Sequence, residues 1–161
     1  MKLTSNQKIR AALMLDSNFQ GGPEDMIWSD AELEGAYSQV LINNARTAAI
    51  ERVETAYRAA LRSFEHAETT WDASDEAAGY LRDLLNRLAN DRGLPRGKTT
   101  VKLRDNTGTT HDLDAEEIKD LGEAGSDHRD ACMERRRELL DQITVAESED
   151  DLPDVTKGWP D

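Results

Sequence analysis

The sequence predicts a mainly α-helical protein with one small β-hairpin, an α+β fold. Capping signals precede stretches in which apolar residues recur at helical spacing, for example at Thr4 and Ser29. Residues 101–113 differ, because they alternate apolar or β-branched with polar residues around a turn. Aromatic residues are 5% of the chain and charged residues 33%, a composition that suits long, thinly covered helices better than a thick globule.

Two capping pairs predict where the first helices begin. Thr4 with Gln7 predicts a short helix that ends at Leu15, and Ser29 with Glu32 predicts the start of the next helix. The stretch SNFQGGPED separates the two, since its glycines and proline interrupt helical spacing.

The second helix is expected to be long. From Asp30 to about His66, only the polar pair Asn43 and Asn44 interrupts the pattern. Unbroken, this helix would span about 55 Å at ~1.5 Å per residue, so we expect it to kink near the asparagines or to project. A projecting helix needs a partner, either another copy or a different subunit. Its first apolar stripe is a candidate interface, formed by Leu33, Tyr37, Val40 and Leu41.

A third helix is predicted after the turn TTWDAS, in which Trp71 is a candidate for burial. Ser74 caps this helix, and four leucines between residues 81 and 88 form its apolar face. Gly93 is expected to end it in the left-handed conformation, and Pro95 prevents its continuation.

The stretch after Val101 has two interpretations, a calcium-binding loop or a hairpin. Asp105 and Glu116 have the types and spacing of the first and last EF-hand ligands, but the sixth position, which needs glycine, is Thr110. The flank before Asp105 alternates at period two, whereas an EF-hand needs a helix there.

The hairpin interpretation accounts for every residue of this stretch. Val101 and Leu103 face one way, DNTG supplies the turn, and Asp114 caps the next helix together with Glu117. We therefore expect a hairpin followed by a helix.

The last helix is predicted over about Ala115 to Val145, with Gly122 and Gly125 allowing a close approach or a bend. The segment after it is acidic and contains prolines, so by itself it should be disordered. Its apolar residues, Leu152 and Trp159, are further candidate interface residues. The expected division is a helical arm (1–66), a compact helix-hairpin-helix domain (67–146) and an acidic extended tail (147–161).

The net charge of −13 and the pI of about 4.6 disfavour nucleic acids and anionic bilayers as partners. The local run Arg135 to Arg137 lies among carboxylates on a predicted helix, where it can form i,i+4 pairs. No apolar run approaches the ~20 residues of a membrane span, and the lone Cys132 fits a reducing compartment. We expect a soluble protein made in a cytoplasm.

The candidate catalytic and ligand-binding patterns in the sequence are incomplete. Gly93 to Gly97 encloses three residues where a P-loop needs four. His128 and Cys132 are four apart on one helix, but no further paired ligands accompany them. The histidine is expected to be exposed and the thiol half-buried. We expect no enzyme activity, no cofactor and no metal.

The order of features from Trp71 to Ala146 resembles a domain of uncharacterised function found in bacteriophage tail-fibre and tail-assembly proteins. These features are an aromatic-x-Ala segment before a Leu-rich helix, a hairpin ending in DNTG, a capped helix, and the end Ile143 to Ala146. The resemblance covers about half of the chain and carries no functional residues over.

The resemblance implies a non-enzymatic structural or adaptor protein of the virion tail, near a tail fibre or baseplate, made in the host bacterial cytoplasm. Its partner would be a fibre or baseplate protein, with a homo-oligomer also possible. One alternative is an assembly chaperone for a tail fibre that leaves before the virion is complete. Another is an acidic mimic of DNA that inhibits a host enzyme, motivated by the charge of −13.

Overall fold

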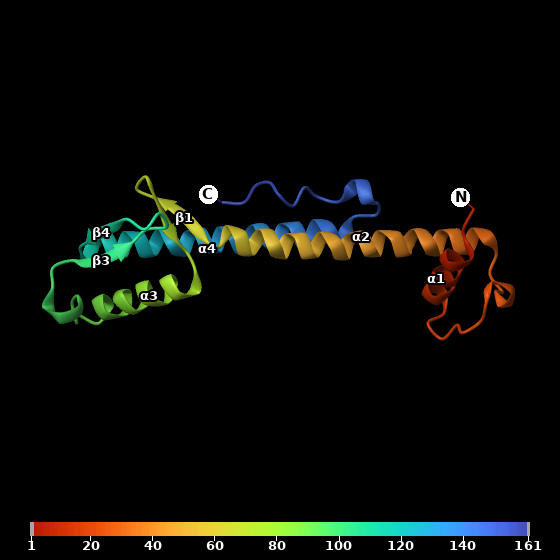
Figure 1. Ribbon diagram of the computed structural model, residues 1–161, viewed down its shortest axis with the longest axis horizontal. Coiled ribbons are helices and arrows are strands. Elements are labelled where there is room, and N and C mark those ends of the chain that lie inside the picture. Colours follow the sequence, from red (N-terminus) through yellow and green to blue (C-terminus); the bar gives the residue numbers. More distant parts are fainter. Residues whose placement is uncertain (1, 161) are drawn as a thin grey trace. The chain divides into compact units, whose positions relative to one another are not determined.

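The computed structural model describes residues 2–160 (Figure 1). Four α-helices, four short strands and three 3₁₀ turns follow one another in this range. The helices are α1 (Ser5–Leu15), α2 (Asp30–Ala60), α3 (Asp75–Ala89) and α4 (Ala115–Val145), and the strands are β1 (Ser63–His66), β2 (Thr69–Asp72), β3 (Val101–Arg104) and β4 (Thr110–Leu113). The turns are η1 (Pro23–Asp25), η2 (Pro95–Gly97) and η3 (Glu149–Asp151).

The expected mainly helical α+β fold is confirmed. The expectation of one hairpin needs a correction, because the described residues contain two separate antiparallel pairs, β1 with β2 and β3 with β4. The difference lies in residues 63–72, which the sequence analysis had divided between the end of a helix and a turn.

The predicted capping pairs are present. The Thr4 side chain accepts from the Gln7 backbone N–H, and the Gln7 side chain accepts from the Thr4 N–H at 2.7 Å. The Ser29 N–H likewise donates to the Glu32 carboxylate at 2.8 Å. Each pair satisfies backbone donors that a helix start would otherwise leave without partners.

Helix α2 is continuous across the asparagine pair but shorter than expected. Asn43 is helical, and its side-chain oxygen accepts from Gln39 at 3.1 Å, so no kink is needed there. The helix ends at Ala60 rather than near His66. The chain then leaves the helix because residues 63–66 pair with β2.

The β1–β2 hairpin turns through Ala67 and Glu68, whose φ angles are 50° and 60°. Two consecutive positive φ angles are typical of the type I′ turn that suits the twist of paired strands. Phe64 stands opposite Trp71 in the register, and both are buried beside Leu121 of α4. Burial of this aromatic pair is therefore the tertiary contribution that stabilises the hairpin.

The β3–β4 hairpin forms as predicted. Its turn is organised by Asp105, whose Oδ1 accepts from the backbone N–H groups of Thr107 at 2.9 Å and Thr109 at 2.8 Å. Gly108 has φ +91° in this turn. Helix α4 then starts with the predicted pair, since the Glu117 N–H donates to Asp114 at 3.0 Å and the Asp114 N–H donates to Glu117 at 2.8 Å. The predicted bounds of α4 are correct.

The chain forms two compact units, and each is discontinuous in sequence. The first runs to Glu51 and includes Asp141–Pro153, and the second holds Arg52–Leu140 and the residues from Asp154 onward. In the first unit, α1 packs on α2 through a core of Leu3, Ala11, Ala12, Leu33, Ala36 and Tyr37. The expected division into residues 1–66, 67–146 and 147–161 was contiguous, so it does not coincide with these units.

In the second unit, α3 lies alongside the N-terminal part of α4, and both hairpins lie next to these helices (Figure 1). Leu84 of α3, Leu94, Val101 of β3 and Ile118 of α4 form one buried cluster there. In neither unit do the described residues include a helix with the length and apolar character that a membrane span requires.

Candidate protein-interaction site

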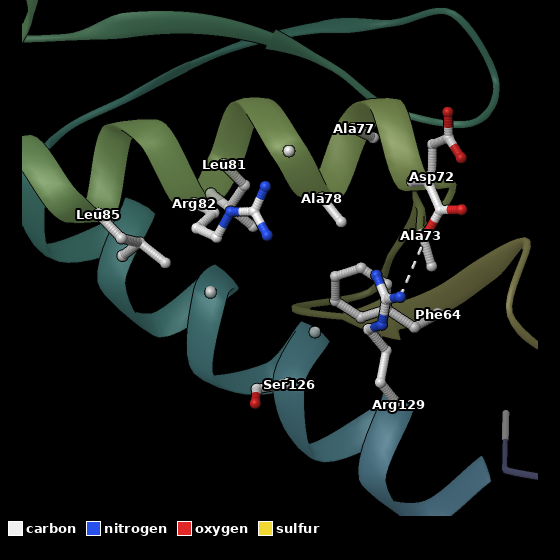
Figure 2. Close-up of a pocket in the computed structure, with 14 residues that line it drawn as sticks. Phe64, Asp72, Ala73, Ala77, Ala78, Leu81, Arg82, Leu85, Ser126 and Arg129 are labelled. Atoms are coloured by element: carbon white, nitrogen blue, oxygen red, sulfur yellow. Dashed lines mark hydrogen bonds and ion pairs between the residues drawn. The ribbon is translucent and has the colours of Figure 1, made fainter. Parts of the chain in front are cut away.

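A groove of about 550 Å³ opens between α3, α4 and the β1–β2 hairpin of the second unit. Figure 2 shows Phe64, Leu81 and Leu85 along its floor. Leu81 and Leu85 are half-buried, as are the small residues Ala77 and Ala78 of α3. Apolar side chains of the described residues are therefore partly exposed to solvent in this groove.

Two glycines of α4 create the space for this arrangement. A Cβ atom on Gly122 would lie 2.5 Å from Cδ1 of Leu85, and one on Gly125 would lie 3.3 Å from Cζ of Phe64. Both values are closer than ordinary contact between carbon atoms, so the missing side chains allow α3 and β1 to approach α4. The sequence predicts a close approach or a bend at these glycines, but their partners come from distant segments and are visible only in the fold.

Charged and polar side chains also line the groove. Arg129 of α4 donates to Asp75 at the start of α3 at 3.3 Å, the dashed line in Figure 2. Arg82 and Ser126 also line the edge and are exposed. An apolar floor with a charged rim suits an aliphatic or aromatic side chain from a protein partner, because burial would remove apolar surface from water while the rim stays solvated.

The four candidate interface residues on α2 differ in their exposure to solvent. Leu33 is 2% exposed and Tyr37 is 7% exposed, and both belong to the core that α1 covers. The Tyr37 hydroxyl also accepts from Gln7 at 3.1 Å. Val40 packs half-buried against this core, whereas Leu41 is 47% exposed. Of the four, only Leu41 presents a large exposed surface.

The two candidate residues of the tail fall in different units. Leu152 is half-buried in the first unit. Trp159, in the second, donates its indole N–H to the Val155 carbonyl at 2.9 Å, and its ring centroid lies 6.2 Å from that of Tyr57. Val155 itself is 4% exposed. Contrary to the expectation of disorder, residues 154–160 are held by these contacts.

Of the three consecutive arginines, Arg135 holds this segment and Arg136 binds α2. Arg135 donates through Nη2 to the Lys157 carbonyl at 2.9 Å. Arg136 donates through Nε to Glu54 at 2.9 Å, and its guanidinium carbon lies 5.4 Å from the centre of the Tyr57 ring. The hydrogen bond to Glu54 raises the pKa of Arg136. These arginines make contacts between elements rather than forming a basic docking face.

The expectation that His128 is exposed is wrong. His128 is 7% exposed, and its ring nitrogen Nε2 lies 2.9 Å from the carbonyl oxygen of Ala60, the last residue of α2. The imidazole therefore satisfies a carbonyl at the helix end that has no partner within the helix. The expectation of a half-buried thiol is wrong as well, because Cys132 is fully buried, and this loss of solvation raises the pKa of its thiol. Within residues 2–160, no group of three or more His, Cys, Asp or Glu side chains could hold a metal ion.

Comparison with known proteins identifies one family. A family model described as a domain of unknown function, DUF4376, matches residues 41–157. This range includes the whole second unit up to Lys157, and with it the groove and the docked segment around Val155. No curated protein and no solved structure matches the chain.

Proposed function

This chain belongs to the family defined by the domain of unknown function DUF4376, and from that premise we propose that it is a non-enzymatic adaptor of a bacteriophage tail, located near a fibre or the baseplate. The placement in a tail depends on the resemblance of residues 71–146 to a domain of tail-fibre and tail-assembly proteins. The mode of action, binding of protein partners, depends on the groove between α3 and α4.

The observation that carries the proposal is the half-buried apolar floor of this groove. Leu81 and Leu85 are presented by α3, and Leu84 of the same helix is anchored in the core at 1% exposure. The floor is thus pre-formed, so the adaptor would lose little conformational entropy when a partner binds. The ion pair between Arg129 and Asp75 at the rim would add orientation rather than much affinity, since exposed pairs contribute little.

The first test is mass spectrometry of purified, intact particles of the source phage or prophage, quantified against the major tail protein. A fixed small copy number supports a virion adaptor. Absence from particles, with co-purification on a fibre expressed alone, replaces the adaptor with an assembly chaperone. Absence from both overturns the assignment to a tail.

The second test asks whether the groove makes the contact. Ser126→Tyr places a ring at the rim, where Ser126 lines the groove and is exposed. The matched control is Asn86→Tyr, an exposed α3 position that does not line the groove. We expect the first variant to lose incorporation into particles and the control to retain it. Equal incorporation of both would exclude the groove as the contact surface.

A further inference from the structure

Residues 92–104 of the second unit are basic, in contrast to the acidic character of the whole protein. This stretch contains five Lys and Arg residues and no Asp or Glu, in a chain whose net charge is −13. Arg96, Lys98, Lys102 and Arg104 are all exposed. Among residues 2–160, Arg96, Lys98 and Arg104 form no ion pair, so their charges are neutralised by solvent alone.

These cations surround an exposed aromatic ring. Tyr80 of α3 is 48% exposed, and it lines two adjoining hollows of about 750 and 240 Å³. Lys102 lines both hollows, Arg96 and Lys98 line the larger, and Arg104 lines the smaller. We call Tyr80 with these four cations the Tyr80 surface.

The backbone fixes this geometry. Arg96 and Gly97 have φ angles of 61° and 65°, and the Gly97 N–H donates to the Leu94 carbonyl at 3.2 Å. Leu94 is anchored in the core with Val101. Arg96 and Lys98 are therefore held on a short, tied loop between α3 and β3, and Lys102 and Arg104 are held in β3 itself, which reduces the entropy lost on binding.

The two carboxylates that line these hollows already have partners. Asp112 lies 3.7 Å from the Lys102 ammonium, and Asp72 accepts from the Ser74 hydroxyl at 3.0 Å. The surface thus keeps an excess of positive charge around an apolar ring. A complementary ligand is an acidic peptide that carries one apolar side chain among its carboxylates.

The chain contains a segment of this chemistry, ESEDDLPD at residues 147–154. It carries five carboxylates and no cation, with Leu152 among them. Glu147, Glu149 and Asp150 are exposed, and their side chains form no ion pair or hydrogen bond in the described part of the chain. The backbone is extended at Leu152, with φ −69° and ψ 136°.

From this complementarity of charge and shape, we propose that the Tyr80 surface of one copy binds the acidic segment 147–154 of a second copy, with Leu152 against Tyr80. The contact is head-to-tail, because each copy offers one surface of each kind. Since the rest of the protein is acidic, two copies repel one another except where these opposite charges meet. This inference goes beyond the proposed function and does not depend on whether the protein belongs to a bacteriophage tail.

Paired charge reversals test the contact by analytical ultracentrifugation. Arg96→Glu with Lys98→Glu brings the formal charge of the four cations of the Tyr80 surface from +4 to 0, and Glu149→Lys with Asp150→Lys brings that of segment 147–154 from −5 to −1. The control for the first pair, Arg58→Glu with Lys119→Glu, changes the net charge by the same amount at two exposed positions outside the Tyr80 surface. All these side chains are exposed, so circular dichroism should show unchanged helix content in every variant.

We expect the wild type and the control to associate as concentration rises, and each reversed variant alone to raise the dissociation constant by about tenfold or more. An equimolar mixture of the two reversed variants should associate again, because the unchanged acidic segment of the first variant then meets the unchanged Tyr80 surface of the second. A wild type that stays monomeric overturns the proposal, as does association that survives the Arg96 and Lys98 reversal or a mixture that fails to associate. A monomeric wild type that binds a DNA oligonucleotide through these cations would instead identify a nucleic-acid site.

Discussion

Replacing Leu84 with alanine tests the packing of α3 against α4. Leu84 is 1% exposed and belongs to the cluster with Leu94, Val101 and Ile118. Removal of its three outer carbons loses about 2.4 kcal/mol at ~0.8 kcal/mol per buried carbon. The cavity that remains adds a further cost, so we expect about 3 kcal/mol of destabilisation in total.

The neighbouring Leu85→Ala is the matched control. Leu85 is half-buried on the open groove, so its removal leaves no closed cavity and should cost only about 1 kcal/mol. Urea unfolding followed by circular dichroism measures both values on the same scale. If Leu85→Ala costs as much as Leu84→Ala, the assignment of Leu84 to the core and Leu85 to the groove is refuted.

Three further predictions concern other parts of the chain. The hydrogen bond from His111 holds the pKa of Asp105 at about 2, below its ordinary 3.8. The ionised Asp105 carboxylate therefore stabilises the fold fully above pH ~4, and this contribution is lost as the pH falls towards 2. A stability difference between Asp105→Asn and the wild type that is the same at pH 6 and pH 2 would contradict this. Gly35→Ala should stabilise α2 by about 0.5–1 kcal/mol, because a Cβ there meets no atom within 4 Å, and an unchanged or lower midpoint of thermal unfolding would count against it. Trp159→Ala should release the end of the chain from Tyr57 and speed tryptic cleavage after Lys157 several-fold, whereas an unchanged cleavage rate would show that the ring contact does not hold the segment.

The sequence predicts element ends well where the signal is local. Thr4 with Gln7 and Asp114 with Glu117 are neighbours along the chain, and the hydrogen bonds between them depend only on local backbone geometry. The turn at Asp105 is similar, since all its acceptor contacts lie within six residues. Such features are encoded by residue type and spacing alone.

The β1–β2 hairpin has no comparable local signal. Its turn consists of Ala67 and Glu68, whereas the type I′ turn is usually marked by Asn-Gly or Asp-Gly. Phe64 also continues the apolar spacing of α2, which extended the predicted helix to about residue 66. The strands form because Phe64 and Trp71 are buried against Leu121, a residue about fifty positions further along the chain.

The candidate site depended even more on tertiary structure. Gly122 and Gly125 were visible as possible points of close approach, but their partners Leu85 and Phe64 come from two other elements. The burial of Leu33 and Tyr37 also depends on tertiary structure. Their spacing indicates an apolar face, but that α1 covers this face is decided by the fold.

The helix caps, the extent of α4, the β3–β4 hairpin and the excess of negative charge follow from the amino-acid sequence alone, because each depends on neighbouring residues or on composition. The fold decided which apolar residues are core and which line a groove. It also decided that the segment around Val155 docks and that the cations of residues 96–104 gather around Tyr80. The physical reason is that burial is a property of residues brought together from distant positions, and its free energy is gained only after the chain has folded.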